Sequence, residues 1–352
     1  MNRIHLHIGL TKTGSSSLQR FLSDEHRMLA ASGTVYPVSG RGRHGTAHHN
    51  LFYEISGGQR GHGKFDAALG GWDSVLAEID EIEGRTAIMS SEAFQYCAPR
   101  DVEQLANLLG PRQSKMVAYV RRQDQWLESA WNQRARFGRV SLDFREFFEA
   151  HGRVLGDYAR TLSPWIDIFG DLRLDIRVYD RIAETPGIVA DFLATYVPDG
   201  YHPVASRTDI RKNARAGVKQ LVAVDQISHV CRAKLGDDFL LPRRSAARIS
   251  EYFRGRQDRY DYRVLSFEDA VAIREIFKRS NEELARISTS FRESGPFPAL
   301  QEHEFDTFVD LPNIGTDIFD EEERRFVHRM ACEIVKASAH SHELAHPIEA
   351  KS

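Results

Sequence analysis

Apolar residues alternate with polar ones, or form short runs, in four segments that we interpret as strands: residues 3–8, 85–90, 115–120 and 172–179. Between these segments, apolar residues recur at the spacing of amphipathic helices, over residues 15–31, 71–82, 100–109, 123–137, 142–150, 157–169 and 186–196. Strands that alternate with helices form a parallel sheet with helices on both faces. The pattern therefore predicts an α/β fold.

The pattern changes after residue 204. Helical spacing continues with little strand signal, over residues 214–232, 243–257, 267–290 and 320–339. We therefore expect two parts. An α/β core over residues 1–204 carries the site, and a mainly helical region over residues 205–352 packs on the core as a candidate substrate cap.

The first strand runs directly into a glycine-rich turn. Residues 4–19 read IHLHIGLTKTGSSSLQ, and the strand pattern gives way to a helical one at the end of the turn. Such a junction can hold an anion, because the N–H groups of the turn converge and the helix N-terminus adds partial positive charge. In a Walker loop for ATP or GTP, the lysine directly follows the second glycine. Here Ser15 follows Gly14, and Lys12 lies inside the loop, which predicts a different anion site.

A second strand–helix junction carries another phosphate-binding pattern. The apolar run of residues 116–120 ends at Arg121 and Arg122, and a helical pattern follows, with Ser129 eight residues after Arg121. An arginine fork can bind a phosphate through two hydrogen bonds, and a hydroxyl can complete its shell. Ligands of parallel sheets bind where the strands end, so we expect this pair near the first turn.

In this order, the two motifs resemble those of the P-loop-type sulfotransferases, which use 3′-phosphoadenosine-5′-phosphosulfate (PAPS). Bacterial sulfotransferase-like proteins are the most similar, over about residues 1–200. The resemblance implies that Arg121 and Ser129 bind the 3′-phosphate, that the product is 3′-phosphoadenosine 5′-phosphate (PAP), and that no metal is needed. It implies that the 5′-phosphosulfate is held by Thr11, Lys12, Thr13, Gly14, Ser15, Ser16 and Ser17. Arg211 and Lys212 resemble, more loosely, a further 3′-phosphate contact.

Sulfuryl transfer also needs a cation at the leaving oxygen and a general base. Lys12 is the expected cation. Glu92 follows the strand over residues 85–90, where heparan sulfate sulfotransferases have a glutamate and cytosolic sulfotransferases a histidine, so the resemblance implies Glu92 as the base. The pair His48 and His49 remains a rival, since histidine titrates near neutral pH without any shift.

The two histidines belong to a long polar segment over residues 40–63, which we expect to be a loop. Loops of this length are uncommon and often functional. A solvated loop without a role in the site is the alternative interpretation. Its basic residues are Arg41, Arg43, His44, His48, His49, Arg60 and His62.

Composition and charge limit the classes of partner and the cellular location that we expect. The net charge of −3 gives no cationic signature of nucleic-acid binding. No signal-peptide pattern and no run of about 20 apolar residues is visible, so we expect a soluble cytoplasmic protein without a membrane span. Cys97, Cys231 and Cys332 show no metal-ligand spacing. Bacterial relatives suggest a carbohydrate or glycolipid acceptor, and the sequence leaves the oligomeric state open.

Two other functions stay open. A P-loop kinase or phosphotransferase would have a similar sheet, although the Walker lysine is missing and no strand ends in a clear acidic Mg²⁺ ligand near the loop. A PAP-binding module without transfer activity would share the motifs, although Lys12, Arg121, Ser129 and a candidate base argue for catalysis. Separately, an arginine-rich segment over residues 243–263 is either an anion-attracting surface or the wet face of a helix.

Overall fold

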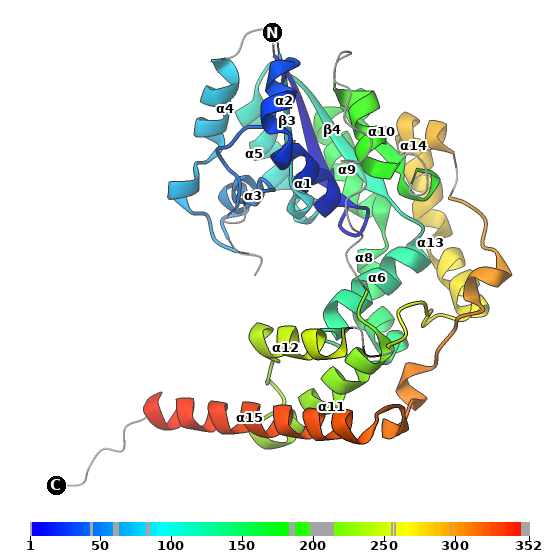
Figure 1. The fold of residues 1–352 in the computed structure, drawn as a ribbon. Helices are drawn as coiled ribbons and strands as arrows, with labels where there is room; N and C mark the ends of the chain where they lie inside the picture. The colour runs from blue at the N-terminus through cyan, green and yellow to red at the C-terminus, as the bar shows by residue number, and fades with distance from the viewer. Residues whose placement is uncertain are drawn as a thin grey trace. The chain divides into compact units, whose positions relative to one another are not determined.

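The structure is a computed structural model that describes residues 2–42, 45–58, 63–81, 85–182, 187–197, 215–254, 256, 258–295 and 297–345. Five parallel strands form one sheet in the order β2-β3-β1-β4-β5 (Figure 1). Their bounds are β1 (Arg3–Gly9), β2 (Thr34–Val35), β3 (Thr86–Ser90), β4 (Gln113–Val120) and β5 (Leu174–Val178). The expected α/β fold class is confirmed. The sequence pattern missed β2, because two residues are too few to show a period.

Helices account for most of the other described segments. They are α1 (Ser15–Asp24), α2 (His26–Ala31), α3 (His49–Ile55), α4 (Trp72–Asp80), α5 (Pro99–Leu109), α6 (Gln123–Ala135), α7 (Phe144–Phe147), α8 (Arg153–Leu155), α9 (Tyr158–Phe169), α10 (Gly187–Tyr196), α11 (Val218–Leu235), α12 (Arg243–Phe253), α13 (Phe267–Ile287), α14 (Thr289–Ser294) and α15 (Glu321–Ala345). The helix expected over residues 15–31 is two helices, which meet at Glu25.

Alternation along β1 divides the core between the two faces of the sheet. Ile4, Leu6 and Ile8 are buried on one face with apolar residues of α3, α4, α5 and α9. His5 and His7 point to the other face, where their rings pack against Tyr196 and Phe192 of α10 and Tyr119 of β4. The apolar residues of α1, α2 and α10 cover that second face. Both faces are therefore buried, as parallel sheets require.

The segment over residues 40–63 is not the continuous loop that we expected. Within it, α3 presents Leu51, Phe52 and Ile55 to the core. A helix of seven residues is too short to show its period among so many glycines and histidines. The segment therefore carries core residues as well as polar ones.

The chain divides into two compact units that interleave in sequence. Unit 1 comprises residues 1–126, 156–213 and 274–299, and unit 2 comprises residues 127–155, 214–273 and 300–352. A single boundary near residue 204 therefore does not describe the division.

The return of residues 274–299 to unit 1 has a local cause at the edge of the sheet. Ser290 Oγ of α14 accepts from the N–H of Ile176 at 2.9 Å, and Ser294 Oγ donates to the carbonyl of Ile176 at 3.1 Å. The helix thus covers the open edge of β5, which would otherwise expose unpaired backbone groups.

Candidate active site

The loop between β1 and α1 has the backbone of an anion-binding turn. Gly9, Lys12 and Gly14 have φ values of 114°, 65° and 85°. Among the residues that the structure describes, Lys12 is the one non-glycine residue with positive φ, and such residues gather at ligand sites. Turns of this kind direct successive N–H groups to one side. The first turn of α1 adds the N–H groups of Ser15 and Ser16, since helix starts leave such groups without intrahelical acceptors.

Two hydroxyl groups close this loop on itself. The hydroxyls of Thr13 and Ser15 donate to the carbonyl oxygen of Leu10 at 2.6 and 3.0 Å, and both side chains are buried. These residues would therefore meet a ligand through their backbone N–H groups. Gly14 is confined, because a Cβ there would lie 2.9 Å from Cγ2 of Ile188.

The start of the loop is held from outside by two side chains. Gln95 Oε1 accepts from the N–H of Thr11 at 3.1 Å, and Trp126 Nε1 donates to the carbonyl of Thr11 at 2.5 Å. Because Trp126 is buried, its hydrogen bond ties the loop to the protein core. The loop side chains that stay partly or fully exposed are those of Thr11, Lys12, Ser16 and Ser17.

Glu92 and His49, the rival bases of the sequence analysis, lie side by side. Glu92 opens the 3₁₀ turn η2 (Glu92–Tyr96) after β3, and His49 is the first residue of α3. His49 Nε2 lies 4.0 Å from Glu92 Oε1, and its Nδ1 lies 2.8 Å from Ser91 Oγ. The two side chains are 32% and 23% exposed, so a ligand can reach both.

Glu92 also adjoins the loop between β1 and α1. The amide of Gln19 in α1 donates from Nε2 to Glu92 Oε2 at 2.6 Å. The backbone of Glu92 packs on Gly9, where an added Cβ would lie 3.2 Å from Glu92 Cα. The carboxylate is thus built into the junction of β1 and α1.

His48 has a structural environment instead. Its ring is fully buried, with Nε2 3.0 Å from the carbonyl oxygen of Pro37 and Nδ1 accepting from the N–H of Ser90 at 3.2 Å. Both ring nitrogens are used, and burial, followed by the charge of Arg41, lowers the pKa of His48 to about 3. These contacts argue against a base at His48 and favour His49 as the histidine candidate.

Arg41 is structural in the same way, since its guanidinium donates to the carbonyls of Tyr36 and Pro37. The other basic residues of the segment, Arg43, His44, Arg60 and His62, lie outside the described residues.

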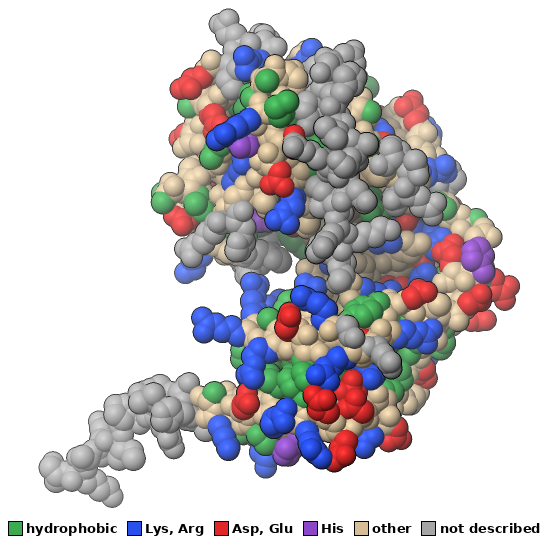
Figure 2. Space-filling model, in the orientation of Figure 1, with side chains coloured by type: hydrophobic (Ala, Val, Ile, Leu, Met, Phe, Trp, Pro, Cys, Tyr) green, Lys and Arg blue, Asp and Glu red, His purple; other side chains and the backbone are tan. Residues whose placement is uncertain are grey.

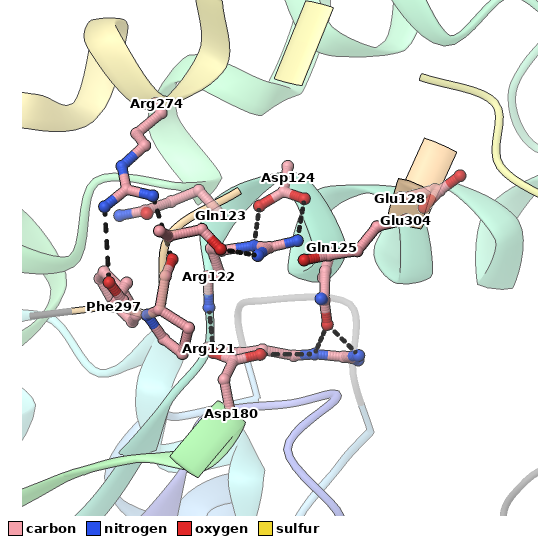
Figure 3. A network of polar contacts seen from close by, with 12 residues as sticks. Arg121, Arg122, Gln123, Asp124, Gln125, Glu128, Asp180, Arg274, Phe297 and Glu304 are labelled. Atoms are coloured by element: carbon pink, nitrogen blue, oxygen red, sulfur yellow. Dashed lines mark hydrogen bonds and ion pairs between the residues drawn. The ribbon is translucent and has the colours of Figure 1, made fainter. Parts of the chain in front are cut away.

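Arg121 is held at the end of β4 by a polar network (Figure 3). Its Nε and Nη2 both donate to Gln125 Oε1, at 3.1 and 2.6 Å, and its Nε lies 3.6 Å from Asp180 Oδ1. Asp180 Oδ2 accepts from the N–H of Arg122 at 2.6 Å, and burial raises the pKa of Asp180. The phenol of Tyr158 donates to the carbonyl of Arg121 at 2.6 Å. The guanidinium is therefore oriented, 26% exposed, and in contact with one neutral and one acidic acceptor.

The remaining predicted contacts are placed less fully. Ser129 lies in α6 with a partly exposed side chain, but the boundary between the two units falls in α6 after Trp126. Its pairing with Arg121 around one phosphate therefore stays a prediction. Arg211 and Lys212 lie outside the described residues.

The arginine-rich segment forms ion pairs within unit 2, of which Arg263 with Glu128, at 2.6 Å, is largely buried and the others are exposed. Basic side chains gather over α12 in Figure 2. Arg248 pairs with Glu333 at 2.9 Å, and Arg254 pairs with Glu251 at 3.1 Å. Such exposed pairs are typical of the wet face of a helix. Arg256 likewise pairs with Glu322.

The described residues also bear on membrane and metal sites. None of their helices combines the length and apolar character that a membrane crossing needs. Nor does any group of three or more histidines, cysteines, aspartates and glutamates among them have the geometry to hold a metal ion.

Comparisons with known proteins identify one similar curated protein and one similar solved structure. No family model matches the chain. An uncharacterized protein of Archaeoglobus fulgidus is 28% identical over 207 residues, which cover 56% of this chain and 52% of that protein. The chain thus spans about half the length of the curated relative that it matches. Among solved structures, a sulfotransferase from Alicyclobacillus acidocaldarius is 20% identical, with a TM-score of 0.38, over 64% of this chain and 91% of that chain. Because these values are low, we assign function from the side chains themselves.

Proposed function

We propose that the protein is a sulfotransferase that moves a sulfuryl group from PAPS to a hydroxyl or amine acceptor. One juxtaposition carries the proposal. The loop with Lys12 follows β1, Glu92 follows β3 and Arg121 follows β4, and β1 lies between β3 and β4 in the sheet. An anion loop thus stands between a carboxylate and an arginine, at the edge where such sheets bind ligands.

The residues of the loop suit a phosphosulfate group. Its N–H groups can bind the non-bridging oxygens, and the ammonium of Lys12 can stabilise the oxygen that becomes negative when its bond to sulfur breaks. Arg121 can bind the 3′-phosphate through its guanidinium. Ser129, Arg211 and Lys212 are proposed as further contacts to that phosphate. None of these roles requires a metal ion.

Glu92 is the proposed base. As the acceptor oxygen attacks sulfur in line with the departing phosphate oxygen, one S–O bond forms and one breaks. The acceptor proton passes to the carboxylate, and PAP leaves with the bridging oxygen. His49, whose Nε2 lies 4.0 Å from Glu92 Oε1, is the alternative base.

Equilibrium binding tests the donor. We expect PAP and PAPS to bind without Mg²⁺ and more tightly than ATP does with or without it. Tighter binding of ATP with Mg²⁺, together with transfer of its γ-phosphate, would establish the kinase alternative. Tight binding of PAP by a protein that transfers no sulfate in a broad acceptor screen would indicate a silent PAP-binding module.

The acceptor class is proposed from the resemblance alone. We propose a carbohydrate or glycolipid hydroxyl. Incubation of the protein and ³⁵S-labelled PAPS with polysaccharide, glycolipid and small-phenol fractions tests this class. Label that appears only in the phenol fraction would redirect the proposal to small aromatic acceptors.

A further inference from the structure

Gln19 is a buried amide on the largely apolar inner face of α1, which also carries the hydroxyl of Ser15. It lies on α1 beside Leu18, Phe21 and Leu22, which are all buried in the core, and only 3% of Gln19 is exposed. Burial of an amide is costly unless its polar atoms find partners. The partner here is Glu92 Oε2, at 2.6 Å from Gln19 Nε2. The carboxylate of Glu92 therefore satisfies the buried amide of Gln19.

The contact makes the two oxygens of Glu92 different. Oε2 accepts from Gln19, whereas Oε1 faces His49 Nε2 at 4.0 Å. The His49 ring is itself oriented by Ser91 Oγ at 2.8 Å from Nδ1, and Gly9 supports the Glu92 backbone from below. Oε2 of Glu92 is thus held by a hydrogen bond within the protein, whereas Oε1 lies on the side of the partly exposed His49 ring.

We infer that Gln19 is a positioning residue that fixes the Glu92 carboxylate so that Oε1 receives the acceptor proton. The inference rests on the proposed function. It also links the two halves of the reaction, because α1 begins at the anion loop and carries Gln19 little more than one turn later. One rigid element then sets both the donor loop and the orientation of the base.

A change of Gln19 to glutamate gives the sharpest test, since it keeps the length of the side chain and replaces the donor by a second carboxylate. Two carboxylates at this distance share one proton, which raises the upper pKa of the pair. Among the residues that the structure describes, the titratable groups that interact with the charge of Glu92 include His7 on β1, Tyr36 after β2, and His49 and Tyr53 on α3. The substitution leaves all four unchanged.

The experiment compares Gln19→Glu, Gln19→Met and the exposed control Gln104→Glu on α5 with the unmodified protein. The carboxyl carbon of Glu92, identified by its loss in Glu92→Gln, is followed by ¹³C NMR as a function of pH. We expect an upper titration step at least about 1 pH unit higher in Gln19→Glu only. A midpoint equal to that of the unmodified protein would overturn the inference.

Turnover gives a second readout. Gln19→Met removes the hydrogen bond but keeps an unbranched side chain of similar length, so we expect kcat to fall about 10-fold with KM for PAPS unchanged. In Gln19→Glu, the acid limb of the profile of kcat against pH should shift to higher pH together with the NMR midpoint. Unchanged kcat in Gln19→Met would refute the positioning role. If the unmodified protein transfers no sulfate while the NMR shift is present, the proposed function fails and the Gln19–Glu92 coupling stands.

Discussion

Replacement of Arg121 by alanine should weaken the binding of PAP. The binding of AMP, which has only a 5′-phosphate, should be almost unaffected. A hydrogen bond from a charged donor to a phosphate contributes about 1.5–3 kcal/mol, and release of the neutral Gln125 acceptor costs about 0.5–1.5 kcal/mol. At the midpoints of the two ranges the difference is about 1.3 kcal/mol, which corresponds to a loss of roughly 10-fold in affinity for PAP. The Gln125 contact, at 2.6 and 3.1 Å, is the reason that we expect no larger effect.

Calorimetry with PAP, adenosine 5′-phosphosulfate and AMP measures this difference, with Arg160→Ala on the exposed part of α9 as the control. A second variant tests how the negative charge of Asp180 affects the affinity for PAP. Asp180→Asn keeps an acceptor for the N–H of Arg122 but removes the negative charge 3.6 Å from Arg121, so PAP should bind several-fold more tightly. Equal affinity of the unmodified protein for PAP and AMP, or an equal loss for both in Arg121→Ala, would refute the assignment.

Three further outcomes follow from the geometry. Lys12→Ala should lower kcat by roughly 10²–10³ with a smaller effect on PAP affinity, because the loop N–H groups remain; near-normal turnover at saturating PAPS would exclude Lys12 as the leaving-group cation. Glu92→Gln should keep PAP binding and lose roughly 10²–10⁴ in turnover, whereas retained activity with an unchanged pH profile would move the base to His49. Burial lowers the pKa of His7 from 6.5 to about 4, so the unfolded chain binds a proton there that the folded chain excludes. The free energy of unfolding should then fall as the pH drops from about 6.5 towards 4, by about 3 kcal/mol for this shift, and a flat urea-denaturation profile over that range would contradict it.

Structural features that depend on consecutive residues, such as strands, helices and the turns between them, could be predicted from the sequence. The α/β class follows from long apolar segments with clear periods, and the loop around Lys12 follows from its glycines between a strand and a helix. Arg121 could be placed at a strand end because the run before it is apolar throughout. Segments too short for a period, such as α3, and the interleaving of the two units could not be predicted, since α14 joins unit 1 only by covering the edge of β5.

The sequence by itself determined the two local junctions: a glycine-rich loop that leads into α1 and an arginine that ends β4. The tertiary structure alone decided their surroundings. His48 and His49 are neighbours in the chain, yet one is buried with both nitrogens bonded and the other faces Glu92. Gln19 and Glu92 are 73 residues apart and meet only because parallel strands bring their carboxyl ends, and the helices that follow, to one edge of the sheet. Hydrogen bonds between such distant side chains leave no period or spacing in the sequence, so only the folded chain shows which side chains are in contact.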